Sequence, residues 1–364
     1  MSDHSNTFIH TLFASRKRSF FIKAGLLFCA LLMISYAIPQ VPGVVVAVFW
    51  VFVTALSAIG FAYFYVVRKT EKQVAKFREG GKLADFNNGR KLCLFVAFVV
   101  SAVFSTSLLL NSAKWELHSW LLLAFSIPLY YFIAQKISVR VNREYKPLFQ
   151  EAGIVKLTFW IVVIVLCALA LLITFRFPSA SYSSVLDALH AAKDPFAHSS
   201  SPLVADAGYF ALVSELLATY GIPKTVQMAF GEFPFVVTIV GSLLIYISIF
   251  VGFVSLLNVC YITPRELRRV FSPLYTEALE QEKPIQKNSV VLSVVFSLAL
   301  VVAFMGVDAH FSQVKQERGY TSLEALTLRA LDGIAYIVDG ENLSEQFSDR
   351  VMQGLQPYTD EENK

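Results

Sequence analysis

The sequence FPFVVTIVGSLLIYISIFVGFVSLLNVCYIT, residues 233–263, contains no Asp, Glu, Lys, Arg or His. Glu232 precedes it, and Arg265 is the first charged residue after it. As a helix this stretch would rise ~1.5 Å per residue, which exceeds the ~30 Å hydrocarbon core of a bilayer. In water such a helix would expose apolar surface on every side. The stretch therefore predicts a transmembrane helix that tilts in the membrane or emerges into water on the Arg265 side.

The composition of the whole chain agrees with a location in the membrane. Of its 364 residues 55% are hydrophobic and only 16% are charged, whereas soluble domains average about 25% charged residues. The four cysteines lie in or beside apolar runs without CxxC spacing, which favours buried, inert thiols over disulfides or a thiolate metal site. The sequence predicts an all-α, polytopic membrane helix bundle that needs no cofactor.

Seven apolar runs are long enough to be transmembrane spans. They are residues 20–38, 44–67, 92–110, 117–134, 157–175, 233–262 and 290–307. A basic tail, residues 1–19, precedes the first run, but that run is long and no small-residue cleavage site follows it, so we expect a retained span. Pro128 lies within the fourth span, where it should kink the helix. Spans 1–5 thus fall in residues 20–175 and spans 6–7 in residues 233–307.

The distribution of basic residues predicts how the chain is oriented. Of the 31 Lys and Arg residues, 22 lie in or beside the N-terminal tail and the segments after spans 2, 4 and 6. Seven spans would place all four of these segments on one side of the membrane, which the positive-inside rule assigns to the cytoplasm. We therefore expect a multi-pass protein of the cell inner (cytoplasmic) membrane, with a cytoplasmic N-terminus and an extracytoplasmic C-terminus.

Two segments are expected on the extracytoplasmic side, residues 176–232 and residues 308–364. In the first, a short helix is predicted at 185–193 and a second at 206–220, ended by Gly221 and Pro223. In the second, Thr321-Ser322-Leu323-Glu324 is typical of a capping box, and weaker periodicity predicts a further helix at 344–355. Neither segment can bury a core alone, so we expect the two to pack together as a small helical cap.

Small and hydroxyl residues follow particular faces of three spans. In span 6 they recur at offsets of 7, 11 and 14 residues from the first, and in spans 3 and 7 at intervals of four. The residues concerned are Ser101, Ser105, Gly241, Ser248, Gly252, Ser255, Ser293 and Ser297. Small residues let helices approach closely in lipid, so the favoured interpretation is a packed seam between helices. The alternative is a polar lining for a permeation path through spans 3, 6 and 7.

The sequence argues against several functional classes. The centres of the spans carry no ionisable side chain of the kind that proton-coupled transporters, pumps and voltage sensors use. Catalytic motifs such as HExxH, GxSxG or a P-loop are missing from the sequence. The basic stretch 68–91 is interpreted as a segment beside anionic headgroups and not as a nucleic-acid site.

Several histidines and acids lie on the expected extracytoplasmic side of the membrane, and they suggest two less favoured hypotheses. Four histidines and three acids could form a divalent metal site, although we expect them to be solvated: His118, His190, His198, His310, Glu116, Asp194 and Asp308. An enzyme acting on lipid would have to use Glu232, His190, His118 and Asp308. Neither hypothesis has a diagnostic spacing, so no metal site and no catalytic residue is predicted.

The leading functional hypothesis is a non-enzymatic subunit or scaffold of a membrane complex. It would recognise a protein partner, or form a homo-oligomer, through the cap or the basic cytoplasmic loops. The alternative is a channel or uncoupled transporter lined by the small and polar faces of spans 3, 6 and 7. In both cases the lipid bilayer is the surrounding medium.

Overall fold

The computed structural model describes residues 2–76, 90–145, 147–176, 184–191, 194–230, 234–263 and 287–339. Over these residues the chain is helical and contains no strand. The helices are α1 (Ser2–Ala37), α2 (Gly43–Lys76), α4 (Arg90–Ser112), α5 (Leu117–Glu144), α6 (Pro147–Arg176), α7 (Val185–Ala191), α8 (Pro202–Leu216), η1 (Leu217–Gly221), α9 (Ile222–Phe230), α10 (Pro234–Tyr261), α13 (Lys287–Arg318) and α14 (Ser322–Asp339). The predicted all-α membrane helix bundle is confirmed.

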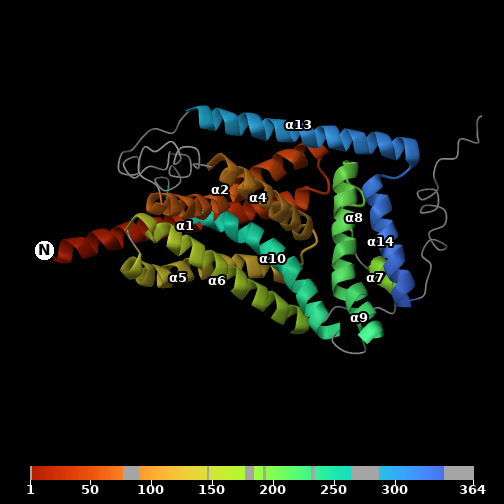
Figure 1. Ribbon diagram of the computed structural model, residues 1–364, viewed down its shortest axis with the longest axis horizontal. Helices are drawn as coiled ribbons and strands as arrows, with labels where there is room; N and C mark the ends of the chain where they lie inside the picture. The colour runs from red at the N-terminus through yellow and green to blue at the C-terminus, as the bar shows by residue number, and fades with distance from the viewer. Residues whose placement is uncertain are drawn as a thin grey trace, which may run out of the picture.

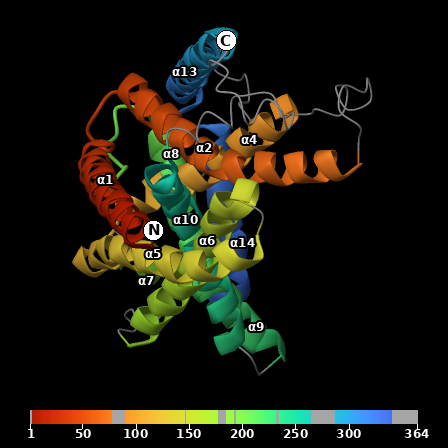
Figure 2. The same ribbon diagram turned by 90° about the vertical axis from the view of Figure 1, so that its left-hand side faces the viewer.

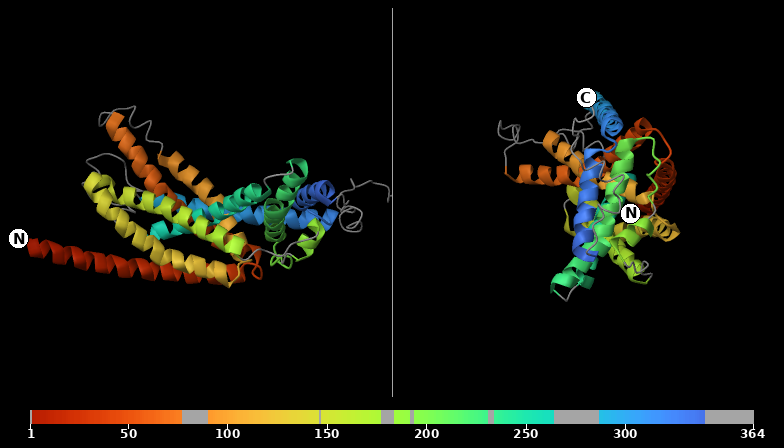
Figure 3. Two further views of the ribbon diagram at one scale, coloured as in Figure 1. Left: turned by 90° about the horizontal axis from the view of Figure 1, so that it is seen from below. Right: turned by 90° about the vertical axis from the view of Figure 1, so that its right-hand side faces the viewer.

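The long helices run between the same two ends of the molecule, with α6 and α10 inclined to α1 and α13 (Figure 1). Helices α1, α2, α4, α5, α6 and α10 form the bundle, and α13 runs along its margin (Figures 1 and 2). Helices α8 and α14 stand across one end of the bundle, with α14 on the far side of α8 from the bundle (Figure 1; Figure 3, left). The chain therefore consists of a lengthwise bundle and a crosswise cap.

Each of the seven predicted spans lies in one of the lengthwise helices. Eight helical segments of the described chain are long and apolar enough to cross a membrane, and the additional one is Pro202–Ala229, formed by α8, η1 and α9. Its direction differs from the other seven, because it lies across the end of the bundle (Figure 1). Length and hydropathy alone do not separate this cap segment from the spans.

The prediction that a helix would end at Gly221 and Pro223 was wrong. Helix α8 begins at Pro202 and passes through the π turn η1 directly into α9, which contains Pro223. A proline ring normally clashes with the carbonyl four residues earlier. In η1 the Ile222 N–H donates to the Leu217 carbonyl, five residues back, and this wider turn makes room for the ring. The helix therefore continues through Pro223, and its hydrogen-bond pattern changes from α to π over one turn.

The helix ends that border the basic segments lie at the same end of the bundle. Helix α2 ends there at Lys76, α4 begins there at Arg90, and the α5–α6 junction, the end of α10 and the start of α13 lie at this end too (Figure 1, left). The cap occupies the opposite end. This arrangement is the one that the alternation of basic segments along the sequence requires for seven spans.

An aromatic cluster fixes α1 to the bundle near the end opposite the cap. Phe20 contacts the rings of Tyr130 and Tyr261 at centroid distances of 5.7 and 6.0 Å. Arg16 lies over the Tyr261 ring at 4.3 Å and forms an ion pair with Glu151 of α6. One cation thus binds an aromatic face of α10 and a carboxylate of α6 together, which joins three helices at one point.

The two segments predicted to form the cap do pack together. Val185 of α7, Val213 of α8 and Leu331 of α14 belong to one buried apolar cluster, separate from the core of the bundle. The predicted start of α14 is confirmed, because the Glu324 N–H donates to the Thr321 hydroxyl at 3.1 Å. The helix predicted at 344–355 lies outside the described residues.

Candidate functional site

The predicted small-residue face of α10 lies against α2, α4 and η1. A Cβ on Gly252 would stand 2.8 Å from the Phe104 carbonyl oxygen of α4, and a Cβ on Gly241 would stand 2.6 Å from the Ala218 carbonyl of η1. On the other side, a Cβ on Gly60 of α2 would overlap the Ser255 carbonyl. Only glycine allows these backbones to approach so closely. This face of α10 is therefore in contact with its neighbours along most of its length.

Hydroxyl pairs cross the same contacts. Ser248 of α10 shares a hydrogen bond of 2.6 Å with Ser107 of α4, and Ser255 shares one with Ser57 of α2. Ser248 and Ser255 also donate to carbonyls of their own helix, those of Ile245 and Gly252. In lipid, where water cannot compete, such bonds hold helices in register.

Ser101 and Ser105 lie inside the bundle, fully buried, and their hydroxyl oxygens have no hydrogen-bond partner among the described residues. Thr54 of α2 is in the same state. We use the name polar seam for the hydroxyls and glycines at the junction of α2, α4 and α10. The polar seam consists of Thr54, Ser57, Gly60, Ser101, Ser105, Gly252 and Ser255.

Two predicted residues lie elsewhere. Ser293 and Ser297 are on α13, which packs mainly against α2 and α8 and has none of its span window buried. The side chain of Ser293 lies outside the described residues, and Ser297 is half-exposed. The structure thus joins the predicted residues of spans 3 and 6 but not those of span 7.

The second span contributes residues that the sequence analysis missed. Thr54, Ser57 and Gly60 follow one another at intervals of three, a helical spacing of small residues that also separates Gly252 from Ser255 in span 6. Applying that pattern to span 2 would have found them. Their pairing with α10 could not have been found in this way, because it joins residues about 200 positions apart.

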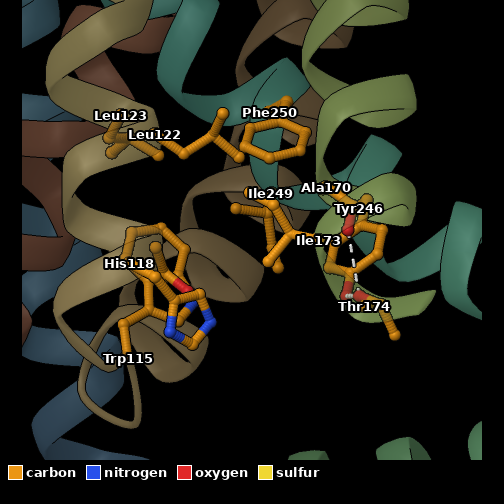
Figure 4. Close-up of a pocket in the computed structure, with 11 residues that line it drawn as sticks. Trp115, His118, Leu122, Leu123, Ala170, Ile173, Thr174, Tyr246, Ile249 and Phe250 are labelled. Atoms are coloured by element: carbon orange, nitrogen blue, oxygen red, sulfur yellow. Dashed lines mark hydrogen bonds between the residues drawn. The ribbon is translucent and has the colours of Figure 1, made fainter. Parts of the chain in front are cut away.

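A groove lies between α5, α6 and α10 near the cap end of the bundle (Figure 4). Its free volume is about 50 Å³, compared with ~10–15 Å³ for one water on that measure. Its apolar wall is interrupted by the polar side chains of His118, Ser119, Thr174 and Tyr246, and the Thr174 and Tyr246 hydroxyls share a hydrogen bond of 2.6 Å. The lining is Trp115, His118, Ser119, Leu122, Leu123, Ala170, Ile173, Thr174, Tyr246, Ile249 and Phe250. It contains no carboxylate or thiol that could act beside the imidazole.

Asp308 joins the margin of the bundle to the cap. It lies on α13 and accepts hydrogen bonds from the Ser201 hydroxyl at 2.7 Å and the Leu203 N–H at 3.2 Å. These donors open α8, where a carboxylate satisfies N–H groups that have no helical partner. A Cβ on Gly43 would stand 2.7 Å from the other carboxylate oxygen, so α2 begins at the same point.

A lysine with a buried ammonium nitrogen lies where the bundle meets the cap. Lys114, in the turn between α4 and α5, places its Nζ 3.7 Å from the Glu215 carboxylate of α8. Burial lowers the pKa of Lys114 from its ordinary value, while the charges of Glu215 and Asp194 oppose that shift. The Lys114 ammonium is thus held under the cap with incomplete compensation.

A second polar contact lies within the cap. Asp206 of α8 is buried and accepts a hydrogen bond from the Thr321 hydroxyl at the start of α14. Lys315, near the end of α13, stands 3.9 Å from Asp206 and 3.5 Å from Glu324. These contacts fix α14 against α8 at the turn where the chain leaves α13.

The histidines and acids of the two less favoured hypotheses are dispersed. His118 lies 3.4 Å from Glu116, in the turn before α5, and Asp308 binds the start of α8. Glu232 and the His190 side chain lie outside the described residues. Within the described chain, no three His, Cys, Asp or Glu side chains come together as a metal site would require.

Helix α14 presents an apolar stripe opposite its packed face. We call it the outer stripe, and it consists of Leu326, Ala330, Gly333, Tyr336 and Ile337, with the exposed Arg329 as a charged residue on the same face. Leu326, Tyr336 and Ile337 are 61%, 66% and 56% exposed, and a Cβ on Gly333 would meet nothing within 4 Å. The packed face carries Leu331 and Ala335, which are buried. Helix α14 is therefore apolar on two faces, and only one of them is covered within the described chain.

Comparison of the chain with family models, with curated proteins and with solved structures found no match.

Proposed function

We propose that this chain is a non-enzymatic subunit or scaffold of a membrane complex and that the cap recognises its protein partner. The observation that carries this proposal is the outer stripe of α14. Apolar surface on the lengthwise helices can face lipid, but α14 lies beyond the end of the bundle (Figure 1). Exposed apolar patches in an aqueous setting are typical of protein interaction sites. A partner that presents an apolar helix or groove would cover the outer stripe.

The proposal includes the orientation expected from the charges. The helix ends beside the basic segments share the end of the bundle opposite the cap (Figure 1), which supports a cytoplasmic N-terminus and an extracytoplasmic cap in a bacterial inner membrane. Reporter fusions after Ala191 and after Asp339 should both be extracytoplasmic. A cytoplasmic reporter at either position would overturn this orientation.

Site-specific photo-cross-linking tests the partner. A benzophenone amino acid at Tyr336, in cells that naturally express the protein, should yield a discrete cross-linked species of higher mass. The matched control is Thr219, which is exposed on η1 but away from the outer stripe. Cross-links at Tyr336 that reach only the same chain, together with purification as a lone monomer in mild detergent, would reject the proposal.

A second candidate function is a channel or uncoupled transporter. The observation that favours it is the group of buried hydroxyls without partners at Thr54, Ser101 and Ser105. The lining would then come from α2, α4 and α10, in place of the predicted spans 3, 6 and 7. Solute flux into liposomes that Ser105→Phe abolishes would support it. Liposomes that stay silent across ions and small solutes would remove it.

A further inference from the structure

The hydroxyl side chains of the lengthwise helices fall into two groups. Most donate to a carbonyl three or four residues earlier, as Ser35 does to Leu31 at 2.7 Å and Ser126 does to Leu123 at 2.6 Å. This is the usual way in which a hydroxyl is satisfied within lipid. Thr54, Ser101 and Ser105 are equally buried, at 0% exposure, yet they make neither this bond nor any other within the described chain.

Of the four buried hydroxyls without partners among the described residues, Thr158 lies on α6 and the other three belong to one place in the bundle. Ser105 adjoins Phe104, whose carbonyl meets Gly252 of α10. Ser101 lies one turn away on the same face of α4. Thr54 precedes Ser57 by one turn on α2, and Ser57 is bonded to Ser255, one turn after Gly252. Since one turn is ~5.4 Å, these contacts place all three hydroxyls within about two turns of one another along the bundle axis.

A further buried polar side chain adjoins the polar seam toward the end opposite the cap. Asn258 follows Ser255 by one turn on α10 and is fully buried. Its side-chain oxygen accepts a hydrogen bond from the Tyr130 hydroxyl at 2.7 Å, while its Nδ2 atom has no partner within the described residues. An amide N–H donor and three hydroxyls thus lie on neighbouring turns of α2, α4 and α10 inside the bundle.

The chemistry of these groups selects the ligand. A buried hydroxyl or amide without a hydrogen bond destabilises the folded protein, and lipid chains cannot supply that bond. A ligand for the polar seam must be small, because Gly60 and Gly252 bring the helix backbones together beside it. It must both donate and accept, since hydroxyls do both and Nδ2 only donates. The seam carries no carboxylate, so nothing there would neutralise a cation removed from water.

We propose that the polar seam binds internal water molecules, held by Thr54, Ser101, Ser105 and Asn258 at the junction of α2, α4 and α10. Each water would bridge hydroxyls of different helices and satisfy two or more of them at once. The junction is then a hydrated contact between three helices of the bundle. This site is independent of the partner proposed for the cap.

Solid-state NMR on the full chain in lipid vesicles tests the proposal without any mutation. With serine and threonine labelled, magnetisation transferred from water protons should build up at Thr54, Ser101 and Ser105 several-fold faster than at Ser126. Ser126 is the matched control, because it is as buried but bonded within its own helix. Equal, slow build-up at all four residues would overturn the proposal.

Two variants sharpen the test. Ser105→Ala should remove a water ligand and slow the build-up at Ser101 and Thr54, whereas Ser126→Ala should leave both unchanged. Loss of the fold in Ser105→Ala would be recognised by its melting behaviour, and Thr54→Val then takes its place. A build-up at Ser101 that Ser105→Ala or Thr54→Val does not alter contradicts a shared water.

Exchanging the cation in the buffer tests whether the polar seam binds water or a monovalent cation. With sodium exchanged for choline in the vesicle buffer, bound water predicts the same build-up at Thr54, Ser101 and Ser105 and the same melting temperature. A build-up or a melting temperature that requires sodium would replace water by a monovalent cation and overturn the proposal as stated.

Discussion

Helices α10 and α13 have span windows of similar hydropathy and differ in their surroundings. Their span windows have mean hydropathies of 2.4 and 2.0, yet 33% of the α10 window is buried and none of the α13 window. In α10, Gly252 meets a carbonyl of α4, whereas a Cβ on Gly306 of α13 would meet nothing within 4 Å. Hydropathy thus identifies a helix suited to lipid, but the fit of small residues against other backbones decides which helix becomes the core.

The largest effect is expected from filling the α4–α10 contact. Gly252→Val would place its Cβ 2.8 Å from the Phe104 carbonyl, a backbone atom that cannot move aside as a flexible side chain can. We expect a loss at or above the upper end of the ~1–3 kcal/mol typical of overpacking. Thermal melting in detergent, followed by size-exclusion chromatography, measures it. The melting temperature of Gly252→Ala should lie between those of Gly252→Val and the native protein. An unchanged melting temperature for Gly252→Val would contradict the close contact.

A moderate loss of stability is expected from removing the contact between Asp308 of α13 and the start of α8. Asp308→Ala removes the acceptor of the Ser201 hydroxyl and the Leu203 N–H, which should cost ~1–3 kcal/mol. Hydrogen exchange should accelerate at the first turn of α8 while the centre of α10 stays protected. His310→Ala, an exposed change on the same helix, is the control. Unaltered exchange at Leu203 in Asp308→Ala would show that the cap holds without this contact.

A smaller, pH-dependent effect is expected at the underside of the cap. Because burial lowers the pKa of Lys114 below its ordinary value of 10.5, the folded protein binds this proton less tightly than the unfolded chain. Its contribution to stability therefore rises with pH between the lowered pKa and 10.5. Lys114→Met should abolish that part of the rise in melting temperature, and Lys17→Met, at an exposed lysine, should not. Parallel curves for Lys114→Met and the native protein would argue against a buried ammonium.

The smallest effect on stability is expected at Gly306 of α13, the helix whose span window is not buried. Gly306→Val adds a side chain where nothing lies within 4 Å, so the isolated protein should change by no more than ~0.5 kcal/mol. The measurement is the same melting experiment used for Gly252→Val. A large loss of stability from Gly306→Val would mean that another chain covers α13 in the detergent-solubilised protein, and the contrast between the two helices would then fail.

Local features of the cap could be predicted in part. The Thr321 N-cap is visible in the sequence because a hydroxyl three residues before Glu324 satisfies an N–H at the helix start. The passage of α8 through Pro223 was not predictable from the proline, which normally ends or kinks a helix. The π turn at 217–221 that accommodates it is held by packing of η1 against α10 and α14. The outer stripe of α14 also required the structure, because it can be recognised only after Leu331 and Ala335 are seen to be covered.

The polar seam, too, could be predicted only in part from the sequence. Gly252 and Ser255 could be predicted as a contact face, since small residues at helical spacing in a membrane span indicate close packing. Their partners, Phe104 of α4 for Gly252 and both Gly60 and Ser57 of α2 for Ser255, could not be assigned, because helix pairing in lipid depends on shape and has no sequence-local signal. The lack of partners for Ser101 and Ser105 likewise follows from which helices surround α4, and the sequence does not contain that arrangement.

By itself, the sequence determined that this protein is a helical membrane protein, because uncharged runs of this length are stable only in lipid and must satisfy their backbone hydrogen bonds as helices. It also determined which loops are basic. Only the tertiary structure decided which helix is central, which is marginal and which apolar face of the cap remains open. Hydrophobicity does not distinguish one helix neighbour from another in lipid, so close packing and a few buried hydrogen bonds make that choice.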